Sequence, residues 1–408
     1  MSFKIGLSTP IIPESPGVEV PGYKEFGLLE YADALLEVAP DSDIHILVSR
    51  DPVNIFYNSP SLFNFITRYY LAGGNQAYWD VVRYYTPGGI TSSPPGLHAK
   101  SFLIDNEFLV IGSQNFDHSA FGNNSDDLDL AEYSIGIEDG SIVSSVNSYL
   151  NSAWNNSGKL WVINKTESPM DILPLVGIGD VVFFEPGTYK ISSTLNIHES
   201  ITLVGSGATI LPEENFSNQS ALKLASPSLQ TSSAPLLRIT GDNVSLIGLT
   251  LQDSSGYAIE VEGGVENVNI SRIIFENNAL GGVYVSDNTS YTIENNTFVG
   301  DDYGITISTN ANSTGVIRNN IFAGQNIAPI HIASANDGTV EYAYNLFYDC
   351  NGGDCSPSNW KIGNLGANSN EHDNLFDLNP LFANPANGDY RLSSGSPAID
   401  AGDSNHIA

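Results

Sequence analysis

A group of polar residues with fixed spacing carries the clearest chemistry in the sequence. His98, Lys100, Asp105, Ser113 and Asn115 follow the pattern His-x-Lys-x4-Asp-x6-Gly-Ser-x-Asn. Residues two apart on a β-strand point to the same face, so His98 and Lys100 are expected to share one pocket, and Ser113 and Asn115 repeat that spacing. These groups suit a phosphodiester. The imidazole would attack phosphorus, while Lys100, Ser113 and Asn115 would hold the non-bridging oxygens as charge develops.

The elements that would position these residues alternate between strands and helices over residues 1–160. Short strands are predicted at 44–48, at 81–85, on both sides of Asp105-Asn106 and at 133–137. Helices are predicted at 28–36 and 62–71, and a closing helix has Ile142, Val146, Leu150 and Ala153 on one face. This order predicts helices packed on a mixed sheet, an α/β sandwich.

The spaced motif resembles that of the phospholipase D superfamily. Six fixed residue types, each used at about 5%, coincide by chance on the order of once per hundred million positions. The resemblance covers about residues 25–155 and is similar to the second half of a cardiolipin-synthase-type chain. It implies a phosphohistidine on His98, formed without a metal or cofactor. Water as acceptor would make the enzyme a hydrolase, and a lipid alcohol would make it a phosphatidyltransferase.

Two further residues receive roles from this resemblance. By position, Glu132 resembles the carboxylate that bonds the far ring nitrogen of the imidazole and keeps it aimed. Asp105 belongs to the candidate catalytic set, although it is expected to tie a turn rather than to react.

The sequence holds one such motif, whereas the superfamily builds each site from two. No second His-x-Lys occurs in the 408 residues. His118 follows Asp117 and has no lysine two residues later. The acid that protonates the leaving alkoxide is therefore expected from outside, either from His98 of a homodimer partner or from a missing N-terminal half. The chain itself is expected to be such a half or to pair with itself.

The charge of the chain narrows the choice of substrate. Fifteen basic residues against 46 acidic ones give a formal net charge of −31, which repels polyanions and disfavours nucleic acid. A local basic pocket can still bind one phosphate. The resemblance to the phospholipase D superfamily implies a phospholipid head group as the preferred substrate. No apolar run approaches the roughly 20 residues that cross a bilayer, and 1–13 do not read as a signal peptide.

The second part of the chain, residues 161–408, has an internal repeat. Leu251, Phe275, Phe298, Phe322 and Phe347 follow at spacings of 24, 23, 24 and 25. Ile259, Val283, Ile305 and Ile330 run in step with them, and asparagine pairs lie close to the aromatic positions. The two series of apolar residues recur with the same period. The segments between them are short β-branched runs with no helical periodicity, so the region is predicted to be an all-β stacked solenoid.

This region resembles the pectate-lyase-like superfamily over about residues 170–402. Residues 187–205 are similar to its first coil, and 389–402 are similar to the last coil of exported microbial members. The resemblance implies a right-handed parallel β-helix, an extracellular or cell-surface location and a polysaccharide partner. A polysaccharide lyase is one alternative, with Arg272 and Arg318 as candidate bases.

Other polar residues of the repeats receive structural interpretations. Asp301-Asp302 is expected to be an acidic turn, and His198 and His331 are expected to be surface residues. Cys350 and Cys355 bracket a short Asn-Gly-Gly-Asp loop and are expected to form a disulfide, with two unpaired thiols as the alternative.

Besides the lyase alternative, two classes of function remain open from the sequence. The leading one is a phospholipase D-type phosphodiesterase or phosphatidyltransferase joined to a β-helix that binds a glycan or a surface. The alternative is an exported β-helix binding or adhesion protein with a vestigial first domain.

Overall fold

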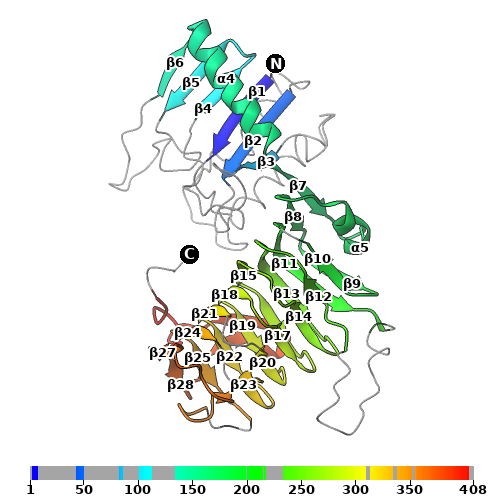
Figure 1. Cartoon of the computed structure of the whole chain (residues 1–408), viewed down its shortest axis with the longest axis vertical. Helices are drawn as coiled ribbons and strands as arrows, with labels where there is room; N and C mark the ends of the chain where they lie inside the picture. The colour runs from blue at the N-terminus through cyan, green and yellow to red at the C-terminus, as the bar shows by residue number, and fades with distance from the viewer. Residues whose placement is uncertain are drawn as a thin grey trace. The chain divides into compact units, whose positions relative to one another are not determined.

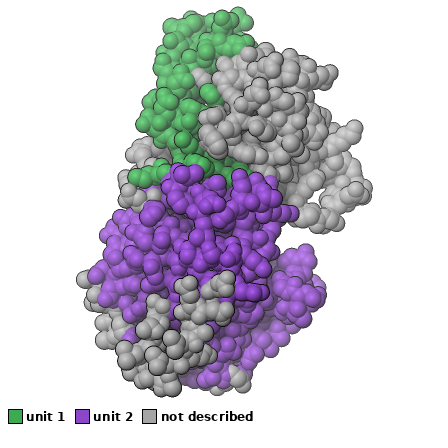
Figure 2. Space-filling model, turned by 90° about the vertical axis from the view of Figure 1, so that its right-hand side faces the viewer, with its two compact units in different colours: residues 1–162, 177–183 green, residues 163–176, 184–408 purple. Residues whose placement is uncertain are grey.

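The computed structural model divides into two compact units. Unit 1 comprises residues 1–162 and 177–183, and unit 2 comprises 163–176 and 184–408 (Figure 1, Figure 2). The structure describes residues 2–7, 43–49, 82–85, 101–112, 134–198, 200–214, 216, 233–308, 313–333, 338–351, 353 and 355–403. Within these ranges, no helix is long and apolar enough to cross a membrane.

Unit 1 contains a mixed β-sheet. Its strand order is β7 (Gly158–Ile163), β3 (Val82–Tyr85), β2 (Asp43–Ser49), β1 (Ser2–Leu7), β4 (Ser101–Ile104), β5 (Phe108–Gly112) and β6 (Ser134–Ile137). The pairs β1–β2 and β2–β3 are parallel, and the others are antiparallel. The strands predicted at 44–48, 81–85 and 133–137 and around Asp105-Asn106 are confirmed. The helices predicted at 28–36 and 62–71 lie outside the described residues.

Helix α4 (Gly140–Asn155) packs on this sheet. Its N-cap is Asp139, whose Oδ1 accepts hydrogen bonds from the backbone N–H groups of Ser141 and Ile142 at 3.0 and 3.1 Å. Val143 and Leu150 form one apolar cluster with strands β4 and β5, and Ala153 packs on β2.

The prediction that Ile142 faces the sheet was wrong, because its side chain is 46% exposed. A helix turns about 100° per residue, so only one of two neighbours can face the sheet. Val143, at 2% exposure, is that neighbour.

Unit 2 is a parallel β-helix built from three stacks of strands (Figure 1). Stack 1 contains the first half of β13 (Ser245–Gln252), then β15 (Val268–Ser271), β18 (Ser290–Glu294), β21 (Thr314–Arg318), β24 (Thr339–Ala343) and β27 (Asn370–His372). Stack 2 contains the second half of β13, then β16 (Ile274–Glu276), β19 (Thr297–Val299), β22 (Ile321–Ala323), β25 (Leu346–Tyr348) and β28 (Leu375–Phe376). Stack 3 contains β10 (Leu195–Ile197), β12 (Leu237–Ile239), β14 (Tyr257–Val261), β17 (Gly281–Val285), β20 (Tyr303–Ile307), β23 (Ala328–Ile332) and β26 (Lys361–Ile362).

The chain between α4 and β12 also contains α5 (Pro169–Ile172), η2 (Leu173–Leu175), β8 (Val181–Phe184), β9 (Gly187–Ile191) and β11 (Thr202–Pro212). Strand β11 pairs in parallel with β9 and with β13, so it starts the regular coils.

The predicted apolar ladders form the core of the β-helix. Phe275, Phe298, Phe322 and Phe347 are all 0% exposed, and their rings stack with centroid distances of 4.5, 4.7 and 5.1 Å. Ile259, Val283, Ile305 and Ile330 are also 0% exposed and pair in register along stack 3. Both ladders are confirmed, because each coil buries an apolar side chain at the position that is equivalent to that of its neighbour.

The asparagines divide between two different bends. Asn296, Asn320, Asn345 and Asn374 form one ladder between stacks 1 and 2, in which each Nδ2 group bonds the next Oδ1 at 3.0 Å. Asn278 instead lies at the bend after stack 2, where its Nδ2 donates to Asp301. Buried amides thus satisfy the backbone where the strands stop.

The C-terminal segment does not form a last coil, so that prediction was wrong. Strand β29 (Phe382–Asn384) leads through η3 (Pro385–Asn387) to β30 (Asp389–Leu392), and the two strands pair antiparallel. The Tyr390 hydroxyl donates to Glu276 Oε1 at 2.6 Å, and Asp403 N donates to Asn319 Oδ1 at 3.0 Å. This segment, residues 378–403, therefore returns along earlier coils, and we call it the C-terminal strap.

Candidate functional site

Asp105 lies in the turn of a β-hairpin formed by β4 and β5. Asp105 and Asn106 have φ values of 50° and 59°, and Glu107 N donates to Ile104 O at 3.0 Å. Asn and Asp tolerate this left-handed conformation better than most residues, and turns of this kind match the twist of the flanking strands. The Asp105 side chain is exposed. Its position favours the structural role expected from the sequence.

The opposite end of the hairpin brings three strand ends together. Ser101 at the start of β4 pairs with Ile111 in β5, and Gly112 at the end of β5 pairs with Ser134 at the start of β6. In the sequence, Lys100 directly precedes Ser101, and Ser113 directly follows Gly112. The sequence segments that carry Lys100, Ser113 and Glu132 therefore adjoin strand ends that lie next to one another in the sheet.

The predicted reacting groups themselves lie outside the described residues. These are His98, Lys100, Ser113, Asn115 and Glu132. The structure does describe strands β4 and β5, which adjoin these residues in the sequence. Leu103 in β4 and Leu109 in β5 are 1% and 0% exposed and pack against α4. A hairpin held in this way provides a rigid base for groups attached to its open end.

The candidate bases of a polysaccharide lyase have structural surroundings. The Arg318 Nε atom lies 2.8 Å from Glu294 Oε2, in an ion pair whose side chains are 17% and 20% exposed. Arg272 follows β15 with a φ of 56°, which places it in a bend. These positions add no support for the lyase alternative.

Asp301 was expected to lie in an exposed acidic turn. That prediction was wrong, because its side chain is 0% exposed. Its Oδ1 atom accepts hydrogen bonds from Asn278 N at 2.7 Å and Asn278 Nδ2 at 3.0 Å. Burial raises the pKa of Asp301 well above its usual range. The burial of Asp301 was not predicted, because its partner Asn278 is 23 positions away in the sequence.

The remaining predicted residues occupy ordinary structural positions. Cys350 and Cys355 are paired by a disulfide. His198 is exposed, whereas His331 is half-buried and stacks on Tyr303 with ring centroids 4.6 Å apart. Within the described ranges, no group of three or more His, Cys, Asp and Glu residues could hold a metal ion.

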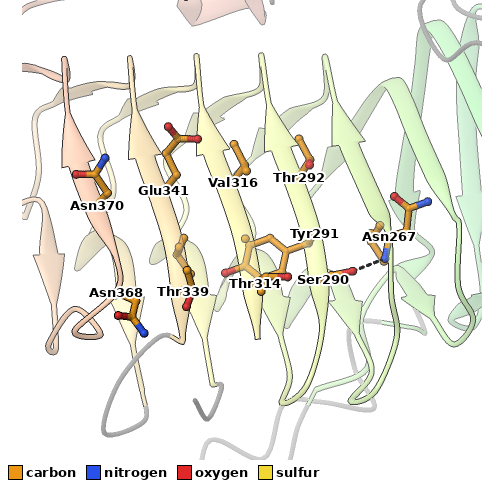
Figure 3. Close-up of a pocket in the computed structure, with 13 residues that line it drawn as sticks. Asn267, Ser290, Tyr291, Thr292, Thr314, Val316, Thr339, Glu341, Asn368 and Asn370 are labelled. Carbon is orange, nitrogen blue, oxygen red and sulfur yellow. Dashed lines mark hydrogen bonds between the residues drawn. The ribbon is translucent and has the colours of Figure 1, made fainter. Parts of the chain in front are cut away.

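A groove of about 560 Å³ crosses the strands of stack 1 (Figure 3). One row of its lining is Ser290, Thr314 and Thr339, in register on β18, β21 and β24. The spacings of this row, 24 and 25, equal those of the phenylalanine ladder, so the repeat itself could have revealed it.

A second row of the groove is Thr292, Val316, Glu341 and Asn370 (Figure 3). Glu341 Oε1 lies 3.0 Å from His372 Nε2, and His372 Nδ1 lies 2.8 Å from Asp373 Oδ2. These hydrogen bonds, to Asp373 first and Glu341 second, raise the pKa of His372. The imidazole thereby fixes the Glu341 carboxylate at the groove.

Comparison with known proteins bears mainly on the β-helix. Residues 177–354 match the family model described as rhamnogalacturonase A/epimerase, pectate lyase-like, so the β-helix is similar to pectate-lyase-like proteins over this segment. No curated protein matches the chain.

Three similar solved structures have low TM-scores, between 0.26 and 0.31. NucT from Helicobacter pylori has 16% identity and a TM-score of 0.26, over 39% of this chain and 81% of its own. Nuc from Salmonella typhimurium, a phospholipase D family member, has 15% identity and a TM-score of 0.26, over 39% of this chain and 80% of its own. The pectate lyase Pel9A has 13% identity and a TM-score of 0.31, over 61% of this chain and 93% of its own.

Proposed function

We propose that unit 1 is one half of a phospholipase D-type phosphodiesterase that acts through a phosphohistidine on His98, and that the β-helix is its binding module. The preferred substrate is a phospholipid head group, and the proposed location is extracellular or at the cell surface. This proposal rests on the pairing of three strands whose ends, Ser101, Gly112 and Ser134, lie close together in the sheet. Each of these ends continues, within two residues, into Lys100, Ser113 or Glu132.

The proposed chemistry has two steps. A nitrogen of His98 attacks phosphorus, and the bond from phosphorus to the leaving oxygen breaks as a second histidine gives that oxygen its proton. Lys100, Ser113 and Asn115 hold the non-bridging oxygens, and Glu132 orients the imidazole. Water or an alcohol then gives its proton to the second histidine and attacks phosphorus, which frees His98. Water yields a phosphomonoester, whereas a lipid alcohol yields a new diester.

The second histidine would come from outside these 408 residues, since no other histidine among them lies in a His-x-Lys motif. A positioned general acid contributes about 10²–10⁴-fold to such a reaction. A twofold pair would supply His98 of the partner and would give each pocket Lys100 and Asn115 twice. A separate N-terminal half would supply its own motif histidine.

The test measures hydrolysis of bis(p-nitrophenyl) phosphate and of phosphatidylglycerol vesicles across a range of protein concentrations. If two copies form the site, specific activity should rise with concentration as dimers form. His98→Ala should lower activity at least about 100-fold, and a phosphorylated histidine should be trapped in the wild type. The matched control is His118→Ala, which should keep wild-type activity.

Activity that survives His98→Ala, or full activity from a proven monomer, would overturn this mechanism. Inactivity at every concentration, both alone and with a complementary half-motif chain, would favour the alternative of a β-helix binding protein with a vestigial first unit. The family match over residues 177–354 and the groove on stack 1 are the observations that support this alternative.

A further inference from the structure

We propose that Asn164 is an acceptor site for N-linked glycosylation, in which an oligosaccharide is attached to its side-chain nitrogen, Nδ2. The inference rests on the proposed extracellular or cell-surface location, because such acceptor sites belong to the surface loops of secreted proteins. It does not depend on the chemistry of His98.

Asn164 begins an Asn-x-Ser/Thr sequon, Asn164-Lys165-Thr166. This pattern is the acceptor motif for N-linked transfer when its middle residue is not proline. The chain has ten such sequons, and short motifs also arise by chance, so local structure must decide between them. The structure describes all three residues of the six sequons that begin at Asn155, Asn164, Asn243, Asn269, Asn288 and Asn295.

The turn after strand β7 brings the two functional groups of the Asn164 sequon together. Asn164 Oδ1 accepts hydrogen bonds from the Thr166 hydroxyl at 2.7 Å and from Thr166 N at 2.9 Å. This is an Asx-turn, in which an asparagine side chain bonds the backbone two residues further on. Glu167 closes the turn, because its N donates to Asn164 O and its Oε2 accepts from Asn164 N, both at 3.0 Å. The carboxamide and the hydroxyl that define the sequon therefore lie side by side.

This turn is open to a large enzyme. Lys165, Thr166 and Glu167 are exposed, and Asn164 is half-buried. Within the described part of the chain, the side-chain hydrogen bonds of Asn164 are made by Oδ1, and none occupies Nδ2. The turn is closed by its own local bonds, so a transferase can enclose it without opening a helix or a sheet.

Two other described sequons lie in regular structure. Asn155 is in the last turn of α4, and Ser157 of its sequon donates to the helix backbone at 2.6 Å. Asn269 is in β15, where its Oδ1 is buried, and Ser271 of its sequon is 7% exposed. Enclosing either sequon in an enzyme would break backbone hydrogen bonds of the helix or the sheet. Asn164 should therefore be the preferred acceptor in the folded chain.

The reaction needs a transferase and a lipid-pyrophosphate-linked oligosaccharide as the sugar donor. Asn164 Nδ2 attacks the anomeric carbon of the first sugar, and a bond forms between the two atoms. The bond from that carbon to the pyrophosphate oxygen breaks, and the oxygen keeps the electron pair. A base of the transferase takes one Nδ2 proton, so the product is a neutral N-glycosyl amide.

The experiment incubates the folded whole chain with a single-subunit oligosaccharyltransferase that accepts Asn-x-Ser/Thr and with a lipid-pyrophosphate-linked oligosaccharide. Mass spectrometry of the digested product then measures the occupancy of each sequon. Asn164 should be modified at least about tenfold more than Asn155 or Asn269. Synthetic peptides that contain the Asn155 and Asn269 sequons should be modified in the same assay, because they lack the helix and the sheet.

Thr166→Val removes the hydroxyl and nearly keeps the shape of the side chain, so the occupancy of Asn164 should fall at least about tenfold. Thr166→Ser restores a hydroxyl and should retain the modification. The matched control is Asn155→Gln, which removes another sequon and should leave the occupancy of Asn164 unchanged.

Three outcomes would overturn the inference. They are no transfer to Asn164 in the folded chain, equal transfer to Asn155 and Asn269 in that chain, and transfer to Asn164 that survives Thr166→Val. None of these readouts involves hydrolysis of a phosphodiester, so a chain that fails the phosphodiesterase test can still pass this one.

Discussion

The Nδ2 group of Asn278 donates a hydrogen bond of 3.0 Å to Oδ1 of Asp301, one coil further along the β-helix. Both side chains are buried, at 1% and 0% exposure. The other carboxyl oxygen of Asp301, Oδ2, has no hydrogen-bond partner in the described part of the chain. A buried carboxyl group thus occupies a position in a ladder of amides.

Replacing Asp301 with asparagine should stabilise the protein at neutral pH. At equivalent positions, Asn278 donates to Leu251 O at 3.2 Å and Gln325 donates to Phe298 O at 3.0 Å. The amide of Asp301→Asn can make the same kind of bond. An unsatisfied buried polar group costs about 1–3 kcal/mol, so the free energy of unfolding should rise by about that amount. Urea unfolding at pH 7 measures it, and the reverse change, Asn296→Asp, should be destabilising.

The same residue should make stability depend on pH. Burial raises the pKa of Asp301 above the value of 3.8 that it has when unfolded, so the folded state holds the proton more tightly. Its contribution is therefore full below about pH 4 and is lost as pH rises toward the folded pKa, by up to about 1.4 kcal/mol per pH unit. The advantage of Asp301→Asn over the wild type should grow as pH increases from 4. An advantage that stays constant with pH would contradict a raised pKa.

Removing one ring of the aromatic column should be strongly destabilising. Phe322 stacks between Phe298 and Phe347 and is 0% exposed. Phe322→Ala should cost about 3–5 kcal/mol through the cavity that it leaves in a close-packed core. Phe322→Leu fills more of that space and should cost less. Thermal or urea unfolding compares the two variants, and equal losses would contradict the cavity explanation.

The C-terminal strap should depend on its contact with the early coils. The Tyr390 hydroxyl donates to the Glu276 carboxylate at 2.6 Å, and burial is the main cause of a raised pKa for Tyr390. Tyr390→Phe removes one hydrogen bond to a charged group, so we expect a loss of about 1.5–3 kcal/mol. Hydrogen exchange should increase in residues 378–403 and at Glu276, while β20 in stack 3 stays protected. Unchanged exchange in the strap would show that other contacts hold it.

The sequence predicted the parts of the fold that repeat. Phe298 and Val283 recur at the coil period, and a period is visible in a single chain. The environment of Asp301 was not predictable in this way, because a carboxyl group in a polar run reads as a turn unless its neighbour in the next coil is known. The contact between Tyr390 and Glu276 joins residues 114 positions apart and follows no period.

In unit 1, local patterns predicted strands β2 to β6 and the Asp105-Asn106 turn, because apolar alternation and turn residues act over short distances. Strands β1 and β7 were not predicted. Ile142 was misplaced because neighbouring apolar residues compete for one face of a helix. The reacting groups at His98 and Lys100 stay a prediction, since they lie outside the described residues.

Asp105 should not take part in the reaction, unlike the other polar residues of its motif. Asp105 has a φ of 50° in the turn of the β4–β5 hairpin, whereas Lys100 precedes the first residue of β4, at the other end. The four residues of β4 span about 13 Å, which is too far for Asp105 to touch a phosphorus held beside Lys100.

Asp105→Asn keeps a residue that favours the left-handed conformation, so we expect less than a threefold change in kcat. Lys100→Ala should lower kcat/KM at least about 100-fold, because it removes a cation from the developing charge. Steady-state kinetics with bis(p-nitrophenyl) phosphate compares the two variants, and circular dichroism checks their folding. A loss with Asp105→Asn as large as that with Lys100→Ala, in a folded protein, would assign Asp105 to the reacting site.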